Sequence, residues 1–297
     1  MLGQERSRSF TATAILFLLP AVAFYVVYML LPIPMSFYYS LFKWDGISPT
    51  KVYSGLSNWD EMLHDTIFWG ALRNNIVLVV LSILIQLPIG LILGVLLTSR
   101  IRFVKLFKTV YFIPMLLSSV AIGLLWKYIY DPTFGLLNSF LRLIGLQHLT
   151  TGWLGDPATA LFSVIGTICW QYIPFYMILF MAAIVGIPDE LYEAAKIDGA
   201  SDLGCFRHVT LPLLRGTISM ASILSLVGSL KYFDLIYVMT EGGPNHSTEL
   251  MATYMYKKAF HSFEMGYGSA VAVAMFAISL IAAVAVMGVT QYDARAL

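Results

Sequence analysis

The segments EAAKIDG at 193–199 and VTLP at 209–212 belong to a short polar region with a regular pattern in an otherwise apolar chain. Pro188 suits the first turn of a helix that runs through the first segment, because its ring fixes φ at a helical value. Gly199 can end that helix in a left-handed conformation at low steric cost, and Ser201 can cap a second helix that stops in the second segment. The sequence therefore predicts a compact helical hairpin.

The hairpin has the features of a docking surface. Ala194, Ala195 and Gly199 are small enough to let the backbone of a partner approach closely, and Glu193 and Asp198 offer hydrogen-bond acceptors to that partner. An amphipathic helix lying on the bilayer surface is the alternative, since such helices are common in membrane proteins. Composition alone does not separate these two interpretations.

The spacing within the hairpin resembles the signature of the cytoplasmic coupling loop in membrane subunits of ABC importers. That signature has Glu-Ala-Ala, three residues, Gly, nine residues, a β-branched aliphatic residue, one residue and Leu-Pro. The chain reproduces it, with Val209 where Ile is commoner. The full spacing favours docking, and the resemblance implies a cytoplasmic loop at 187–213 that couples to an ATPase through Glu193, Ala194, Ala195, Asp198, Gly199, Leu211 and Pro212.

The composition places the rest of the chain in a lipid bilayer. Hydrophobic residues make up 59% of the 297 residues and charged residues 12%, and the mean hydropathy is +0.78. This is too few charges to cover the surface of a soluble protein of this size. A membrane-spanning helix needs ~20 apolar residues, and six stretches are long enough: 13–38, 72–98, 106–130, 159–186, 214–239 and 268–290. We expect an all-α integral membrane protein with one transmembrane domain, residues 1–297.

The short link between the second and third stretches carries the clearest sign of orientation. It contains four basic residues and no acidic residue, namely Arg100, Arg102, Lys105 and Lys108. Lys and Arg favour the cytoplasmic side of a membrane. With six spans, the same side holds both chain ends and the 187–213 loop. The longer connections at 39–71, 131–158 and 240–267 are then outside.

No catalytic group, metal site or nucleotide-binding loop is expected in this chain. The five histidines are scattered over the connections without the spacing of metal ligands. The sequence has no Gly-rich phosphate loop ending in Gly-Lys-Ser or Gly-Lys-Thr, so ATP would be bound by another chain. Gly90 and Gly94 form a small-residue pair that suits close helix packing. Cys169 and Cys205 are expected to be packing residues.

Lys231 and Asp234 are charged residues within the fifth apolar stretch. Charges inside a membrane are costly and often functional, which favours a gating or entry role. Their place toward the outer end of the stretch also allows an i, i+3 ion pair and side chains that reach the interface. We favour the second, structural interpretation and keep the first open.

One face of the fourth stretch and one face of the fifth combine aromatic, hydroxyl and small side chains near mid-membrane. Helical spacing places the members of each set on one face. These candidates for a substrate path are Ile168, Tyr172, Phe175, Ser225, Gly228, Ser229 and Tyr232. Such a surface suits a sugar, which offers hydroxyls for hydrogen bonds and apolar ring faces for stacking. Helix packing is the alternative, above all for Ile168 and Gly228.

Further motifs resemble the carbohydrate-uptake branch of the same importer family over nearly the whole chain. They are GLSNW at 55–59, NN at 74–75, YFIP at 111–114, YFD at 232–234, YVMT at 237–240, GGP at 242–244, STE at 247–249 and GYGSA at 266–270. The chain is similar to the first membrane subunit of importers for maltose, glycerol phosphate or oligosaccharides. Unlike for the maltose subunit, we expect neither extra amino-terminal helices nor a large external domain. The resemblance aligns the path candidates with substrate-contacting positions of that subunit. It also makes 242–244 a candidate contact for a binding protein, although a plain turn explains the same residues.

The resemblance implies a type I ABC importer fold and a non-catalytic, multi-pass subunit in the cytoplasmic (inner) membrane of a bacterium or archaeon. The implied partners are a second homologous membrane subunit, two cytoplasmic ATPase subunits that bind ATP and Mg, an extracytoplasmic solute-binding protein, a carbohydrate substrate and membrane lipid, with no nucleic acid. Transport would follow alternating access. An ion-coupled secondary transporter is the competing class, but it would carry intramembrane acids and inverted repeats, and neither is found. A membrane-embedded enzyme would need an acid, base or metal set that the sequence does not offer.

Overall fold

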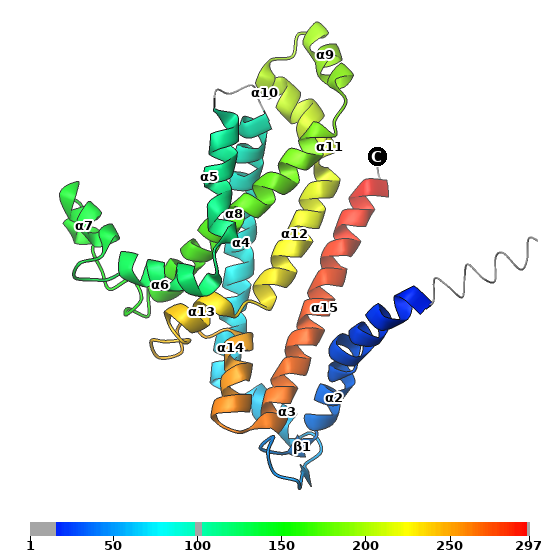
Figure 1. Ribbon diagram of the computed structural model, residues 1–297, viewed down its shortest axis with the longest axis vertical. Coiled ribbons are helices and arrows are strands. Elements are labelled where there is room, and N and C mark those ends of the chain that lie inside the picture. Colours follow the sequence, from blue (N-terminus) through cyan, green and yellow to red (C-terminus); the bar gives the residue numbers. More distant parts are fainter. Residues whose placement is uncertain (1–15, 99–102, 296–297) are drawn as a thin grey trace, which may run out of the picture. The chain divides into compact units, whose positions relative to one another are not determined.

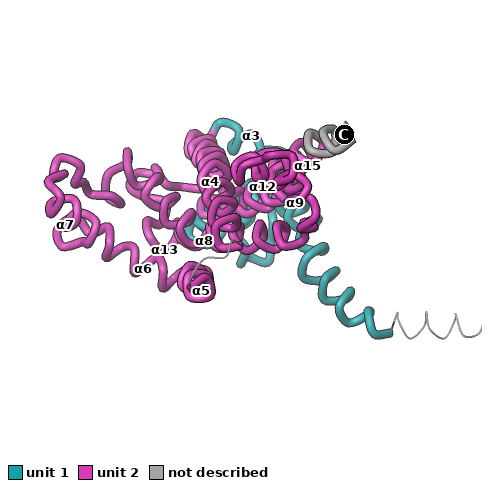
Figure 2. The backbone as a smooth tube through the Cα atoms, turned by 90° about the horizontal axis from the view of Figure 1, so that it is seen from above, with its two compact units in different colours: residues 1–64, 255–274 teal, residues 65–254, 275–297 magenta. Residues whose placement is uncertain are grey.

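The computed structural model describes residues 16–98 and 103–295. Nearly every element in these ranges is a helix (Figure 1), which confirms the all-α class. The chain divides into two compact units, residues 1–64 with 255–274 and residues 65–254 with 275–297 (Figure 2). Arg100 and Arg102, on which the predicted orientation partly depends, lie outside the described residues, as do residues 13–15 of the first apolar stretch.

The first unit begins with an apolar helix over Leu16–Tyr39, which includes η1 (Val26–Leu30) and α2 (Pro32–Tyr39). Its other elements are β1 (Phe42–Lys43), β2 (Val52–Tyr53), α3 (Ser57–His64), η4 (Lys257–His261) and the start of α15 (Met265–Arg295). The two strands pair antiparallel. Buried Asn58 fixes the chain beside them, because its Nδ2 donates to the carbonyls of Ser40 and Phe42 at 2.8 and 2.9 Å.

The second unit contains the longest helices. Its elements are α4 (Thr66–Thr98), α5 (Val104–Leu116), α6 (Ser119–Ile129), α7 (Leu136–Leu143), η2 (Gln147–Leu149), α8 (Ala160–Val185), α9 (Asp189–Ile197), α10 (Asp202–Cys205), η3 (Phe206–Thr210), α11 (Leu211–Leu213), α12 (Arg215–Leu230), α13 (Asp234–Met239), the start of α14 (Met251–Tyr256) and the rest of α15. Among the described residues, five helices are long and apolar enough to cross a membrane, and the α5–α6 pair would make a sixth if it counts as one span.

The helices α4 and α8 pack closely along each other because two glycines face the contact. A Cβ atom at Gly90 would lie 2.8 Å from the Cβ of Tyr176, and one at Gly94 would lie 3.2 Å from the Cβ of Phe180. Any larger residue at these positions would push the helices apart. The predicted role of Gly90 and Gly94 in helix packing is therefore confirmed.

The stretch 106–130, expected as one helix, is two helices that meet at 98°. Leu117 separates them with an extended backbone, φ −78° and ψ 147°. The Ser118 side chain then accepts a hydrogen bond from the Val120 N–H at 3.3 Å and caps α6. The bend arises because a serine cap starts a new helix where a continuous apolar pattern predicted none.

Candidate functional site

A cavity of about 300 Å³ lies in the second unit among α4, α5, α8, α12 and the segment that follows α12. All seven residues predicted for the substrate path line it, namely Ile168, Tyr172, Phe175, Ser225, Gly228, Ser229 and Tyr232. The structure adds Gln86, Met115, Tyr176 and Leu224 to the lining. Two faces that the sequence placed separately on two helices thus meet around one space.

Aromatic rings make much of the wall. The rings of Tyr172 and Tyr232 meet edge to face, with centroids 6.2 Å apart and planes at 83°. Phe175 and Tyr176 make a second edge-to-face pair at 5.1 Å and 84°. Such rings give a ligand apolar surface of fixed orientation, because each ring is braced by its neighbour.

Two hydroxyl groups of the wall are buried without a hydrogen bond of ordinary length and angle to the part of the chain that the structure describes. They are Ser225 Oγ and Tyr232 Oη. Buried polar groups normally have partners, because leaving a donor or acceptor unpaired costs free energy. Hydroxyls left unpaired around a cavity can bond to a polar ligand inside it.

Gln86 and Tyr176 are polar residues of the cavity that the sequence reasoning missed, and Gln86 carries an amide. It is buried on α4, and its Nε2 lies 3.7 Å from Cys169 Sγ. An amide in the middle of the long apolar stretch 72–98 was a usable signal, because polar side chains within a membrane helix mostly face protein or a cavity.

The cavity carries no formal charge, since none of its eleven lining residues is Asp, Glu, Lys, Arg or His. Metal binding is equally unsupported, because no group of three or more His, Cys, Asp or Glu residues within the described ranges could hold an ion. The chemistry on offer is therefore ring stacking and neutral hydrogen bonding.

Lys231 and Asp234 do not line the cavity and do not pair with each other. Both side chains are exposed. The helix α12 ends at Leu230 and α13 starts at Asp234, so the i, i+3 geometry of a continuous helix is lost between them. The predicted ion pair is wrong for this reason.

The predicted hairpin at 187–213 follows α8 and precedes α12. Its first helix, α9, starts after Pro188, and Gly199 follows that helix with a φ of 85°. The Ser201 side chain accepts a hydrogen bond from the Gly204 N–H at 3.2 Å at the start of α10. The left-handed turn at Gly199 and the Ser201 cap are confirmed.

The second arm of the hairpin ends close to the predicted place, but Pro212 is not the residue that ends it. Pro212 lies in the first turn of α11, where its missing N–H costs little. The helix ends at Leu213, and Leu214, with ψ near zero at −2°, separates it from α12.

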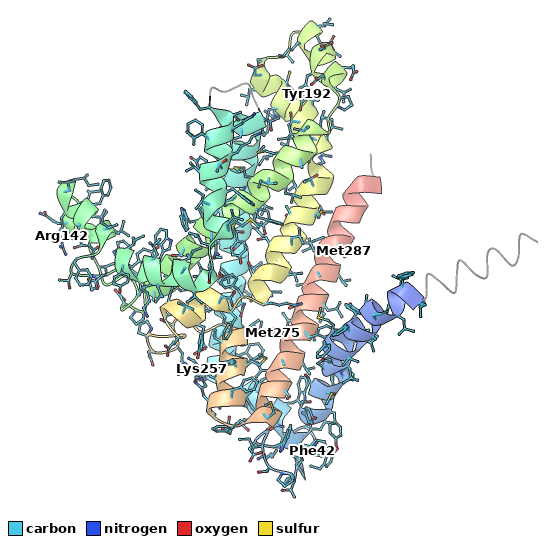
Figure 3. The ribbon with its side chains drawn as sticks, viewed as in Figure 1. Phe42, Arg142, Tyr192, Lys257, Met275 and Met287 are labelled. Atoms are coloured by element: carbon cyan, nitrogen blue, oxygen red, sulfur yellow. The ribbon has the colours of Figure 1, made fainter. Side chains whose placement is uncertain are left out.

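The coupling candidates fall into two groups on the hairpin. Glu193, Ala194, Asp198 and Gly199 are exposed, Ala195 is half-buried beside them, and Leu211 and Pro212 are half-buried on the second arm. The hydroxyl of Tyr192, labelled in Figure 3, lies 3.0 Å from Thr210 Oγ1 and ties the two arms together. Ile197 and Leu203 are 86% and 75% exposed. A docking role of the hairpin stays a prediction.

The GGP segment at 242–244 belongs to a tightly bonded turn. Gly242 has a φ of 78°, and a side chain there would collide with the buried carboxylate of Glu249. Thr248 Oγ1 donates to the Gly243 carbonyl at 2.7 Å. These contacts account for the glycines within the turn, and a role of 242–244 in contacting a binding protein stays a prediction.

Comparison with known proteins gives one family and several relatives. Residues 86–292 match the family model described as "Binding-protein-dependent transport system inner membrane component". The probable ABC transporter permease protein YurN of Bacillus subtilis is 41% identical over 267 residues, which is 89% of this chain and 91% of YurN. The diacetylchitobiose uptake system permease protein NgcF of Streptomyces coelicolor is 33% identical over 97% of this chain and 86% of NgcF. The trehalose/maltose transport system permease protein MalF of Thermococcus litoralis is 30% identical over 89% of both chains.

A solved structure shares the fold. It is a bacterial ABC transporter involved in the import of the acidic polysaccharide alginate, with a TM-score of 0.81, 22% identity and coverage of 98% of each chain. At this identity the likeness shows the arrangement of helices alone, and it agrees with the expected type I importer fold.

Proposed function

The chain belongs to the family of binding-protein-dependent transport system inner membrane components, and we propose that it is the membrane-spanning subunit of an ATP-driven importer of neutral sugars or oligosaccharides. The observation that carries the substrate class is the cavity. Seven residues selected from the sequence line one uncharged space with ring faces and two unpaired hydroxyls. That combination fits a sugar, which needs stacking surfaces and hydrogen-bond partners together.

The names of the relatives support the same substrate class. NgcF is named for diacetylchitobiose uptake and MalF of Thermococcus litoralis for trehalose and maltose. LacF of Rhizobium radiobacter, a lactose transport system permease protein, is 36% identical over 82% of both chains. The absence of charge from the cavity wall favours neutral sugars over acidic ones.

The connection between hairpin and cavity supports ATP-driven alternating access. The hairpin links the end of α8 to the start of α12 (Figure 1), and both of these helices line the cavity. A partner that displaces the hairpin therefore moves two walls of the cavity at once. Closure of an ATPase dimer on the hairpins would open the path toward a binding protein, and hydrolysis would reset it.

The proposed assembly follows from these roles. A second homologous membrane subunit completes the path, and two cytoplasmic ATPase subunits bind ATP and Mg and dock on Glu193, Asp198 and the turn at Gly199. A solute-binding protein delivers the sugar to the opposite side. The chain crosses the cytoplasmic membrane of a bacterium or archaeon as one transmembrane domain, with both ends and the hairpin in the cytoplasm and lipid around its outer surface.

ATP hydrolysis by the reconstituted complex tests this function. The complete complex in lipid nanodiscs, with its binding protein, is assayed with maltose, lactose, diacetylchitobiose and an acidic alginate oligosaccharide. We expect at least one neutral sugar to stimulate hydrolysis and the acidic one not to. Stimulation by the acidic sugar alone would refute the neutral substrate class. Sugar uptake by this chain without the ATPase subunits would refute the importer itself.

A further inference from the structure

Two adjacent asparagines, Asn74 and Asn75, lie near the start of α4 and make five hydrogen bonds to distant parts of the second unit. Asn75 is fully buried. Its Nδ2 donates to the carbonyls of Ser229 and Leu230 at 3.0 and 3.3 Å. Its Oδ1 accepts a hydrogen bond from the Met251 N–H at 2.8 Å. One amide thus binds two segments that are far apart in the sequence.

The first of these segments is the point where α12 ends. The helix stops at Leu230, so the carbonyls of Ser229 and Leu230 lack the N–H groups that a continuing helix would supply, and Ser229 keeps only turn hydrogen bonds from the N–H groups of Lys231 and Tyr232. Within a bilayer, no water replaces these donors freely, and a break in a helix persists only where other groups satisfy its backbone. Asn75 is such a group, and the break it satisfies lies between the cavity residues Ser229 and Tyr232.

The second segment is the approach to α14. Met251 is the first residue of α14. Asn74 binds just before it, since its Nδ2 donates to the carbonyls of Ser247 and Glu249 at 3.0 and 2.9 Å. The segment 247–251, which follows the turn at 242–244, is therefore held to the same end of α4 as the break in α12.

We propose that Asn75 is a positioning residue for the cavity. It holds the broken end of α12 so that Ser229 and Tyr232 face the cavity, and it ties this wall to segment 247–251, so that the two shift together. The importance of this tie for transport rests on the proposed function, in which the cavity lies on the substrate path. The coupling of the two segments through one amide does not depend on it.

Asn74 provides a matched control. It has the same side chain on the same helix, and it also bonds to backbone carbonyls, but only to those of Ser247 and Glu249. If these asparagines merely stabilise the packing of membrane helices, replacing either one should raise amide exchange in the surrounding segments to a similar degree. If Asn75 couples two segments, only the replacement of Asn75 should raise amide exchange in the cavity wall around Ser229 and Tyr232.

Hydrogen–deuterium exchange on the complete complex in nanodiscs tests the coupling without any sugar. In Asn75→Ala we expect amide exchange to rise about tenfold in peptides covering both 229–236 and 251–256, the change expected for loss of a buried hydrogen bond. In Asn74→Ala we expect the rise in the peptide covering 247–251 and wild-type exchange at 229–236. Unchanged exchange at 229–236 in Asn75→Ala, or an equal rise there in both variants, would overturn the proposal.

A milder variant, Asn75→Ser, keeps the test possible if the complex of Asn75→Ala does not assemble. Asn75→Ser keeps one hydroxyl that can donate or accept but cannot serve both segments, so exchange should still rise in one of the two peptides. If it stays at the wild-type rate in both, Asn75 does not couple them.

The dependence of ATP hydrolysis on sugar concentration gives a second measurement, made with whichever of the four assayed sugars stimulates hydrolysis. The sugar concentration for half-maximal stimulation should rise about fivefold or more in Asn75→Ala, with a smaller change in Asn74→Ala. A fall in maximal rate at unchanged sugar dependence would overturn the positioning role. If no sugar stimulates hydrolysis at all, the proposed function fails, while the exchange result still decides the coupling.

Discussion

Replacing Tyr232 by Phe should leave the empty complex at least as stable as the wild type while weakening its response to sugar. The Tyr232 hydroxyl is buried and makes no hydrogen bond of ordinary length and angle among the described residues, although the Tyr172 hydroxyl is close enough to interact with it. A buried polar group without a partner costs about 1–3 kcal/mol relative to one that is absent. Tyr232→Phe removes the hydroxyl and keeps the ring that meets Tyr172 edge to face. The midpoint of thermal unfolding should therefore stay equal or rise.

The same hydroxyl is expected to bond to the sugar, so its loss should raise the sugar concentration for half-maximal ATP hydrolysis. A neutral hydrogen bond contributes about 1 kcal/mol, which corresponds to a change of about fivefold. The assay combines thermal unfolding of the purified complex with ATP hydrolysis in nanodiscs over a range of sugar concentrations.

Tyr130→Phe is the matched control, because the chemical change is identical and the surroundings are opposite. The buried Tyr130 hydroxyl donates to the Ser163 carbonyl at 3.0 Å, and Tyr130 does not line the cavity. Its loss should lower the unfolding midpoint and leave the sugar dependence unchanged. The reasoning is refuted if Tyr232→Phe lowers the midpoint like Tyr130→Phe and leaves the sugar dependence at the wild-type value.

Three further predictions address topology, coupling and the path. A cysteine at Asn245, which is exposed, should react with an impermeant thiol reagent in intact cells, whereas one at Ile197 should react only after the cells are opened; the reverse pattern would contradict the predicted orientation. Gly199→Ile forces a β-branched residue to a φ of 85°, a strain of about 1–3 kcal/mol, and should sharply reduce transport while membrane insertion persists; normal transport would mean that the turn is not fitted to an ATPase. Tyr172→Ala should reduce uptake at least tenfold with normal assembly and basal hydrolysis, and wild-type uptake at equal expression would place the path along another face.

The candidate site was largely predictable because its residues are spaced for a regular helix. Ile168, Tyr172 and Phe175 recur at helical intervals, and periodicity fixes which residues share a face. Gly199 and Ser201 were predictable for a similar reason, since left-handed turns and helix caps each depend on one residue and its nearest neighbours. Local rules of this kind need no knowledge of the tertiary structure.

Interruptions within apolar stretches were harder to predict. The bend at Leu117 lies within an apolar stretch, and the end of α12 at Leu230 is marked only by the charged residues Lys231 and Asp234, which the predicted fifth span placed on a continuous helix. At the second break, the freed carbonyls accept hydrogen bonds from Asn75, which lies more than 150 positions away in the chain. The predicted pairing of Lys231 with Asp234 failed because it assumed that this helix was continuous.

The sequence by itself determined the membrane environment, the helical class, the hairpin at 187–213 and the two helix faces that line the cavity, because these follow from composition and from contacts within a few residues. Only the tertiary structure decided that the two faces enclose one cavity, that Gln86 on α4 joins them, and that Asn75 ties the cavity wall to segment 247–251. The physical reason is that burial and hydrogen bonding between distant segments depend on which helices pack together, and periodicity within a single helix does not specify that partner.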